Sequence, residues 1–165
     1  RDIPSGKVVS TQASLVDIHP TIMNATGEGL TAEDMNLPGK SLLDLVCEEE
    51  PGRTVLSEYH DGGSITGMFM IRRKHLKYIC YPGYPPQLFD LEEDPHESTD
   101  LAQNSDYRHE VEDCHRVLSG LVDPICVNRQ AFTEQAAKVE ELGGRDGIES
   151  LENFDQSPVP DFSEL

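Results

Sequence analysis

Four short apolar segments crowd the middle of the chain, and they constrain its fold more than any other feature. The segments are predicted strands at residues 54–60, 67–72, 76–81 and 87–91. The connections between them are only a few residues long, whereas a parallel crossover needs about a dozen residues or more. The spacing therefore predicts an antiparallel meander of about four strands.

Helical patterns precede this predicted sheet. A helix is expected over about residues 17–26, with Asp17 as its cap and Pro20 in the first turn, where an amide hydrogen is not needed. Its apolar stripe is formed by Ile18, Ile22 and Met23. A short helix is expected over residues 41–47.

Two further helices are expected after the sheet, over about residues 107–122 and 125–142. The first has an apolar stripe that should pack on the sheet, formed by Val111, Cys114, Val117, Leu118 and Leu121. The fold class that follows is α+β, with a small antiparallel sheet and helices packed on one side of it.

The charge of the chain argues against two classes of partner. It has 31 acidic and 13 basic residues and a formal net charge of -18. Such a surface repels phosphate backbones and anionic lipid, so no nucleic-acid or membrane partner is expected. No stretch approaches the roughly 18 apolar residues that a membrane span needs.

Three groups of short motifs carry a family resemblance. The first is Ser-Leu-Val-Asp-Ile-His-Pro-Thr at residues 14–21, followed by Pro-Gly-Lys-Ser-Leu at 38–42. The second is Val-Leu-Ser-Glu-Tyr-His at 55–60, with Gly63 and Ser64 behind it. The third is Met-Ile-Arg at 70–72 and Lys-Tyr at 77–78, then Gln-Leu-Phe-Asp-Leu-Glu-Glu-Asp-Pro-His-Glu at 87–97. In order and spacing, these motifs resemble the C-terminal part of type I sulfatases, the formylglycine-dependent group that includes arylsulfatases and choline sulfatases.

The resemblance implies a division of the chain into three parts within an alkaline-phosphatase-like sulfatase fold. Residues 1–52 would be the end of the sulfatase α/β domain and a linker, and residues 53–122 the C-terminal sheet with its packing helix. Residues 123–165 would be a helical extension and an acidic tail, through which a homo-oligomer could form.

The resemblance also implies that the chemistry lies upstream of this chain. Sulfatases of this type use a formylglycine made from Cys or Ser in a Cys/Ser-x-Pro/Ala-x-Arg motif, with calcium or another divalent cation that stabilises the developing charge. The only similar segment here is Cys-Tyr-Pro-Gly-Tyr at residues 80–84, which lacks the Arg and is interpreted as a turn. No catalytic residue, metal ligand or bound cofactor is therefore expected in this chain, which should be inactive without the missing N-terminal catalytic domain.

His60 and Ser64 are the candidate substrate-binding residues. They flank Gly62 and Gly63 after a predicted strand, so the backbone could bend closely around a ligand. In a sulfatase this loop would face the rim of the active site, where both side chains could hydrogen-bond to substrate. The competing interpretation is a strand-end histidine with structural partners, followed by an ordinary turn.

Several functions remain open on the sequence. The substrate could be a sugar sulfate, an aryl sulfate or choline sulfate, and a phosphonate or phosphate ester hydrolase of the same superfamily is a close alternative. A non-catalytic acidic binding or oligomerisation module is the alternative from another class. The basic run from Arg72 to Lys77 could bind an anionic substrate or form a hairpin turn with paired charges. The compartment is not readable.

Overall fold

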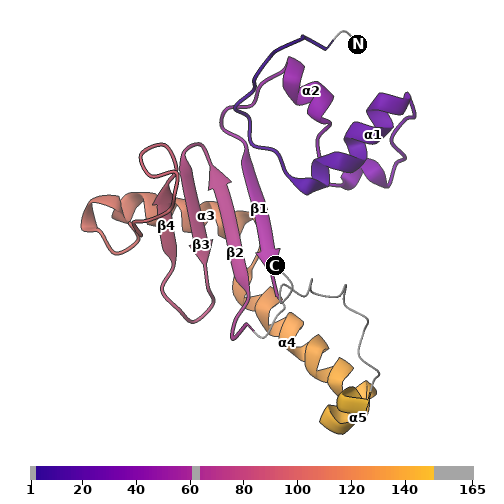
Figure 1. The fold of residues 1–165 in the computed structure, drawn as a ribbon, viewed down its shortest axis with the longest axis vertical. Helices are drawn as coiled ribbons and strands as arrows, with labels where there is room; N and C mark the ends of the chain where they lie inside the picture. The colour runs from indigo at the N-terminus through magenta and orange to yellow at the C-terminus, as the bar shows by residue number, and fades with distance from the viewer. Residues whose placement is uncertain (1–2, 61–63, 151–165) are drawn as a thin grey trace, which may run out of the picture. The chain divides into compact units, whose positions relative to one another are not determined.

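The computed structural model describes residues 3–60 and 64–150, and at its centre is an antiparallel sheet (Figure 1). Its strands are β1 (Thr54–Tyr59), β2 (Met68–Arg73), β3 (Leu76–Cys80) and β4 (Gln87–Asp90). They lie in the order β1-β2-β3-β4, and every neighbouring pair is antiparallel. The predicted meander is confirmed, and each strand starts and ends within one residue of its predicted limits.

One face of this sheet holds the core. The register places Phe69 opposite Cys80, Ile71 opposite Tyr78, and Tyr78 opposite Leu88, so these side chains share a face. Helix α3 (Arg108–Leu121) packs on β2 and β3. The predicted stripe of this helix is confirmed at Cys114 and Leu118, which are buried.

Two features of the sheet packing were not predicted: one predicted stripe residue is exposed, and the second face of the sheet is partly buried. Leu121 is 54% exposed, because it is the last residue of α3 and extends past the packed part of the helix. Ile79 and Phe89 are buried although they lie on the opposite face to Tyr78 and Leu88. The sheet is therefore partly covered on both faces around β3 and β4.

The N-terminal segment has four short helical elements. They are η1 (Leu15–Asp17), α1 (Ile18–Thr26), η2 (Asp34–Asn36) and α2 (Leu42–Cys47). Gly27 ends α1 in the left-handed conformation, with φ +78°. The hydroxyl oxygen of Ser41 accepts a hydrogen bond from the amide of Leu43 at 3.3 Å, so this residue caps α2.

Asp17 is the N-cap residue of α1, as predicted, but its side chain makes no capping hydrogen bond to this helix. Its carboxylate is fully buried and accepts hydrogen bonds from the amides of Ser14 at 2.7 Å and Lys40 at 2.9 Å. Arg53 at the start of β1 donates two more, at 2.8 and 2.6 Å. The carboxylate thus joins three separate segments of the chain. Periodicity could not reveal this, because Arg53 is 36 residues away.

Gly39 explains why the Pro-Gly-Lys-Ser-Leu motif contains glycine. A Cβ at this position would lie 2.0 Å from the carbonyl oxygen of Val16. The neighbouring amide of Lys40 donates to Asp17. The close approach of the two backbones therefore needs a residue without a side chain.

The apolar stripe predicted for the first helix is mostly exposed in this chain, and only its member Met23 is half-buried. Ile18 is 46% exposed and Ile22 is 55% exposed. Leu15 and Val16, just before α1, are 87% and 48% exposed. The amphipathic pattern is present, but most of its apolar side stays exposed among the described residues.

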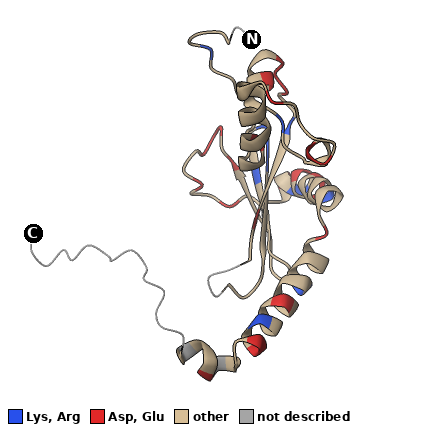
Figure 2. Ribbon diagram, turned by 90° about the vertical axis from the view of Figure 1, so that its right-hand side faces the viewer, with Lys and Arg blue, Asp and Glu red and all other residues tan. Residues whose placement is uncertain are grey.

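The chain forms two compact units, residues 1–125 and 126–165. Helix α4 (Pro124–Glu141) starts at the end of the first unit, and α5 (Gly144–Ser150) belongs to the second. Acidic and basic residues both occur along α4 (Figure 2). The predicted helix at 125–142 is confirmed, whereas α5 was not predicted. No helix in the described residues is long and apolar enough to cross a membrane.

Candidate functional site

Two loops meet at one end of the sheet, and they carry the candidate site. Strands β1 and β3 end here, while β2 and β4 begin here, so residues 64–67 before β2 lie near the loop at residues 81–86 (Figure 1). The hydroxyl of Thr66, which is 5% exposed, donates to the carbonyl of Pro82 at 2.9 Å. This hydrogen bond fixes one loop to the other.

His60 is held at this end of the sheet by two neighbouring side chains. Its Nε2 lies 3.1 Å from Oε2 of Glu58, and its ring meets the ring of Phe69 edge-on, with 5.1 Å between the centroids. Phe69 is fully buried, so it gives the imidazole a rigid support. The side chains of His60 and Glu58 keep 24% and 31% of their surface exposed. The result is an oriented imidazole that keeps part of its surface exposed, although its Nδ1 is buried.

Ser64 lies in the same loop, but its hydroxyl already has a structural role. It is exposed, and its Oγ donates to the carbonyl of Thr66 at 2.5 Å. Its lone pairs can still accept a hydrogen bond, because a hydroxyl is both donor and acceptor. The glycine pair between His60 and Ser64 falls in residues 61–63, outside the described residues.

Three further residues shape this site and were not among the predicted site residues. Glu58, Thr66 and Phe69 orient His60 or fix its loop. Glu58 could have been found, since residues two apart on an extended strand share a face. Phe69 and Thr66 are brought in by strand pairing and by a loop contact, which no local pattern encodes.

The segment at residues 80–84 is a turn, as predicted. The amide of Tyr84 donates to the carbonyl of Tyr81 at 2.9 Å, and Gly83 has φ +85°. Burial raises the pKa of the Cys80 thiol, which disfavours the reactive thiolate.

The basic run forms the β2–β3 hairpin at the opposite end of the sheet. Arg73 pairs with Asp113 at 2.7 Å, and Lys77 pairs with Glu97 at 2.6 Å. Lys74 sits in the turn with φ +53°. The interpretation as a turn with paired charges is confirmed for these residues.

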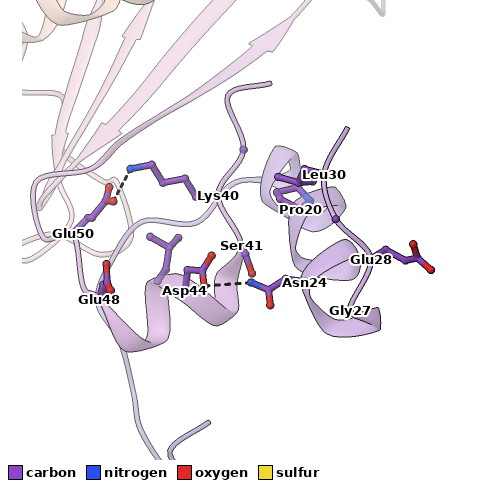
Figure 3. A pocket seen from close by; sticks show the side chains of 13 residues that line it. Pro20, Asn24, Gly27, Glu28, Leu30, Lys40, Ser41, Asp44, Glu48 and Glu50 are labelled. Atoms are coloured by element: carbon purple, nitrogen blue, oxygen red, sulfur yellow. Dashed lines mark hydrogen bonds and ion pairs between the residues drawn. The ribbon is translucent and has the colours of Figure 1, made fainter. Parts of the chain in front are cut away.

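A polar hollow of about 720 Å³ lies beside α1 and α2 (Figure 3). Carboxylates dominate its lining, with Glu28, Asp44, Glu48 and Glu50. Lys40 pairs with Glu50 at 2.5 Å, and the amide of Asn24 donates to Asp44 at 3.2 Å. No group of three or more His, Cys, Asp or Glu able to hold a metal ion occurs among the described residues. The hollow therefore has the character of a solvated acidic surface.

Comparison with known proteins gives consistent matches. The chain is 34% identical over 149 residues to arylsulfatase K of Danio rerio, a match that covers 80% of this chain and 27% of that protein. A crystal structure of a putative sulfatase from Bacteroides thetaiotaomicron aligns with a TM-score of 0.54 and 26% identity, over 63% of this chain and 23% of that one. The phosphonate monoester hydrolase of Agrobacterium radiobacter aligns with a TM-score of 0.55 and 25% identity, over 71% and 26%. No family model matches. The chain thus spans about a quarter of the length of these relatives.

Proposed function

Since this chain matches the C-terminal part of a sulfatase, we propose that it completes the substrate pocket of a longer enzyme that hydrolyses an organic sulfate ester. In this role the chain supplies a folded support and part of the pocket rim. The observation that carries the proposal is His60, which is oriented by Glu58 and Phe69 at the end of β1 and keeps part of its side chain exposed.

His60 would contact the substrate directly, and Ser64 would assist. Because Nδ1 is buried, the atom that would donate a hydrogen bond to a sulfate, hydroxyl or carboxylate oxygen is Nε2, which also contacts Glu58. The hydroxyl oxygen of Ser64 can accept one from a substrate hydroxyl. Neither residue has the surroundings of a nucleophile, so their effect is expected on substrate binding rather than on bond cleavage.

The exposed apolar side of the N-terminal segment supports packing against the longer part of the enzyme. Leu15, Val16, Ile18 and Ile22 would be covered by the catalytic domain, since an apolar face of this kind gains free energy when it leaves water. Residues 1–52 would then belong to the α/β domain and its linker.

A formylglycine and a divalent cation would be supplied by that catalytic domain. The described residues of this chain do not fit either group, because they form no metal-ligand cluster and Cys80 lies outside a Cys-x-Pro-x-Arg motif. We therefore expect no turnover of an aryl sulfate by the 165-residue chain with calcium present. Metal-dependent turnover by the pure chain would overturn this part of the proposal.

The test of the substrate role is His60→Ala in the longer enzyme. We expect kcat/KM to fall by about 5- to 150-fold, mainly through KM, which corresponds to about 1–3 kcal/mol for a lost hydrogen bond to substrate. His75→Ala is the matched control. His75 also lies near a carboxylate, with its Nε2 3.8 Å from Oδ2 of Asp90, but it is at the opposite end of the sheet. Equal kinetics for His60→Ala and the wild type, at equal stability, would show that His60 is structural.

The same assay distinguishes the alternative substrates. Aryl, sugar and choline sulfates should be compared with a phosphonate monoester, because a phosphonate monoester hydrolase shares the fold of this chain. A larger effect of His60→Ala on the phosphonate than on every sulfate would favour the phosphonate alternative.

A further inference from the structure

A second groove lies beside the candidate site, and its two walls have different chemistry. It has a volume of about 780 Å³, within the usual range for small-molecule sites. One wall is the loop at residues 81–86, and the other is α3 from Val111 to Ser119, with residues 123–125 after it. All its lining residues belong to the first compact unit.

The loop wall is aromatic and held in place. Tyr81 donates its hydroxyl to Oε1 of Gln87 at 3.0 Å, and Pro82 is tied to Thr66. The turn at Gly83 presents Tyr84, which is 53% exposed. An exposed aromatic ring in a fixed loop offers a flat apolar surface at little cost in conformational entropy.

The helix wall is polar. Glu112, His115, Arg116 and Ser119 line the groove, and their spacing puts them on one face of α3. They include an acceptor, donors and a hydroxyl. Arg116 pairs with Asp113, which limits its freedom.

The floor of the groove fixes His115. Its Nδ1 lies 3.0 Å from the hydroxyl of Tyr78, and the two rings meet edge-on with 6.2 Å between centroids. A tyrosine phenol is protonated at neutral pH, so it can donate to Nδ1 when this nitrogen carries no hydrogen. In that arrangement Nε2 of a neutral imidazole carries the hydrogen and is a donor.

We propose that this groove binds a neutral pyranose ring. A pyranose has an apolar face of C–H groups, suited to Tyr81 and Tyr84, and an edge of hydroxyls, suited to the polar side chains of α3. The lining carries both signs of charge, with Glu112 and Asp123 beside His115 and Arg116, so it has no net positive charge that would favour an anionic ligand. Aromatic grooves also bind proline-rich peptides, but such a peptide has few groups to pair with the helix wall.

The test is a titration of the full 165-residue chain, followed by amide chemical shifts in NMR. The probes are the methyl glycosides of glucose and galactose, phenol as a ring without a hydroxylated edge, and a proline-rich peptide. We expect at least one glycoside to shift amides of residues 78–86 and 112–125. Tyr84→Ala should weaken this binding at least tenfold, whereas Tyr84→Phe should keep it within about twofold.

Two further variants make the test specific. Tyr59→Ala removes another tyrosine of similar exposure, 48%, from outside the groove and should leave glycoside binding unchanged. Glu112→Ala should weaken glycoside binding and leave any binding of phenol unchanged. Binding of phenol or the peptide without a glycoside, glycoside shifts outside the groove, or equal binding by Tyr84→Ala would each overturn the proposal. The titration requires no sulfatase turnover, so its outcome is independent of the test on His60.

Discussion

Two pairs of an acidic and a basic side chain lie within or next to sulfatase-like motifs, Asp17–Arg53 and Glu58–His60. Their surroundings differ. The side chains of Asp17 and Arg53 are 0% and 9% exposed, and two backbone amides also donate to the carboxylate. The side chains of Glu58 and His60 are 31% and 24% exposed. A motif residue can thus be required by the fold or be available to a ligand, and burial with saturated hydrogen bonding separates the two cases.

The two pairs should also differ in energy. Removing one partner of a buried pair leaves an uncompensated charge, which costs about 3–5 kcal/mol. A partly exposed pair contributes about 0–1 kcal/mol to stability, because water competes for both groups. Measurements of unfolding therefore test the comparison directly.

The largest effect is expected for Arg53→Ala. It should lower the free energy of unfolding by about 3–5 kcal/mol, because the carboxylate of Asp17 stays buried without its cation. Urea denaturation followed by circular dichroism measures the change. Arg73→Ala, which breaks the more exposed pair with Asp113, is the control and should cost about 1 kcal/mol or less. Similar losses for both variants would contradict the distinction between buried and exposed pairs.

The next effect tests the backbone contact beside the buried pair. Gly39→Ala should destabilise the chain by about 1–3 kcal/mol, since its Cβ would meet the carbonyl of Val16 and force the two segments apart. The control is Gly29→Ala, where a Cβ would meet nothing within 4 Å. An unchanged urea midpoint for Gly39→Ala would show that the segment moves at little cost.

The fold was more predictable than the contacts that hold it. Short connections between strands determine antiparallel pairing, so all four strands followed from local spacing. The role of Asp17 did not, because its partner Arg53 is distant in sequence and the local pattern equally suits a helix cap. The apolar side of α1 was predicted from periodicity, but periodicity does not say what covers it. His60 and Ser64 could be chosen from the sequence because they flank a glycine pair after a strand. The roles of Phe69 and Thr66 could not, because they depend on the register of the sheet and on a contact between two loops.

The pH dependence of stability should also depend on the buried pair. Burial alone would raise the pKa of Asp17, but hydrogen bonds from Arg53 and from the amides of Lys40 and Ser14 outweigh it and hold the pKa below its ordinary value. The folded state therefore binds this proton less readily than the unfolded state does. Its contribution is complete above the unfolded pKa of about 3.9 and is lost as the pH falls through the lower folded pKa.

Asp17→Asn should reduce the slope of stability against pH below about pH 4, which urea midpoints at several pH values would measure. Some slope should remain, because the pKa of Asp34 is lowered by hydrogen bonds from Thr31 and that of Asp113 by its hydrogen bond from Arg73. Asp113→Asn is the matched control for an exposed pair. An acid slope identical to wild type in Asp17→Asn would mean that the buried carboxylate does not govern acid unfolding.

The smallest effect on stability is expected for Glu58→Gln, and this variant sharpens the comparison most. The amide keeps the shape of the side chain but removes the charge beside His60, so the free energy of unfolding should change by about 1 kcal/mol or less. If Glu58 serves to orient His60 toward a substrate, kcat/KM of the longer enzyme should still fall, by less than in His60→Ala, and the double variant should lose little more than His60→Ala alone. A purely structural pair would give the reverse, with equal kinetics and a measurable loss of stability. Additive kinetic losses in the double variant would show that the two side chains act separately, and would remove Glu58 from the role of positioning His60.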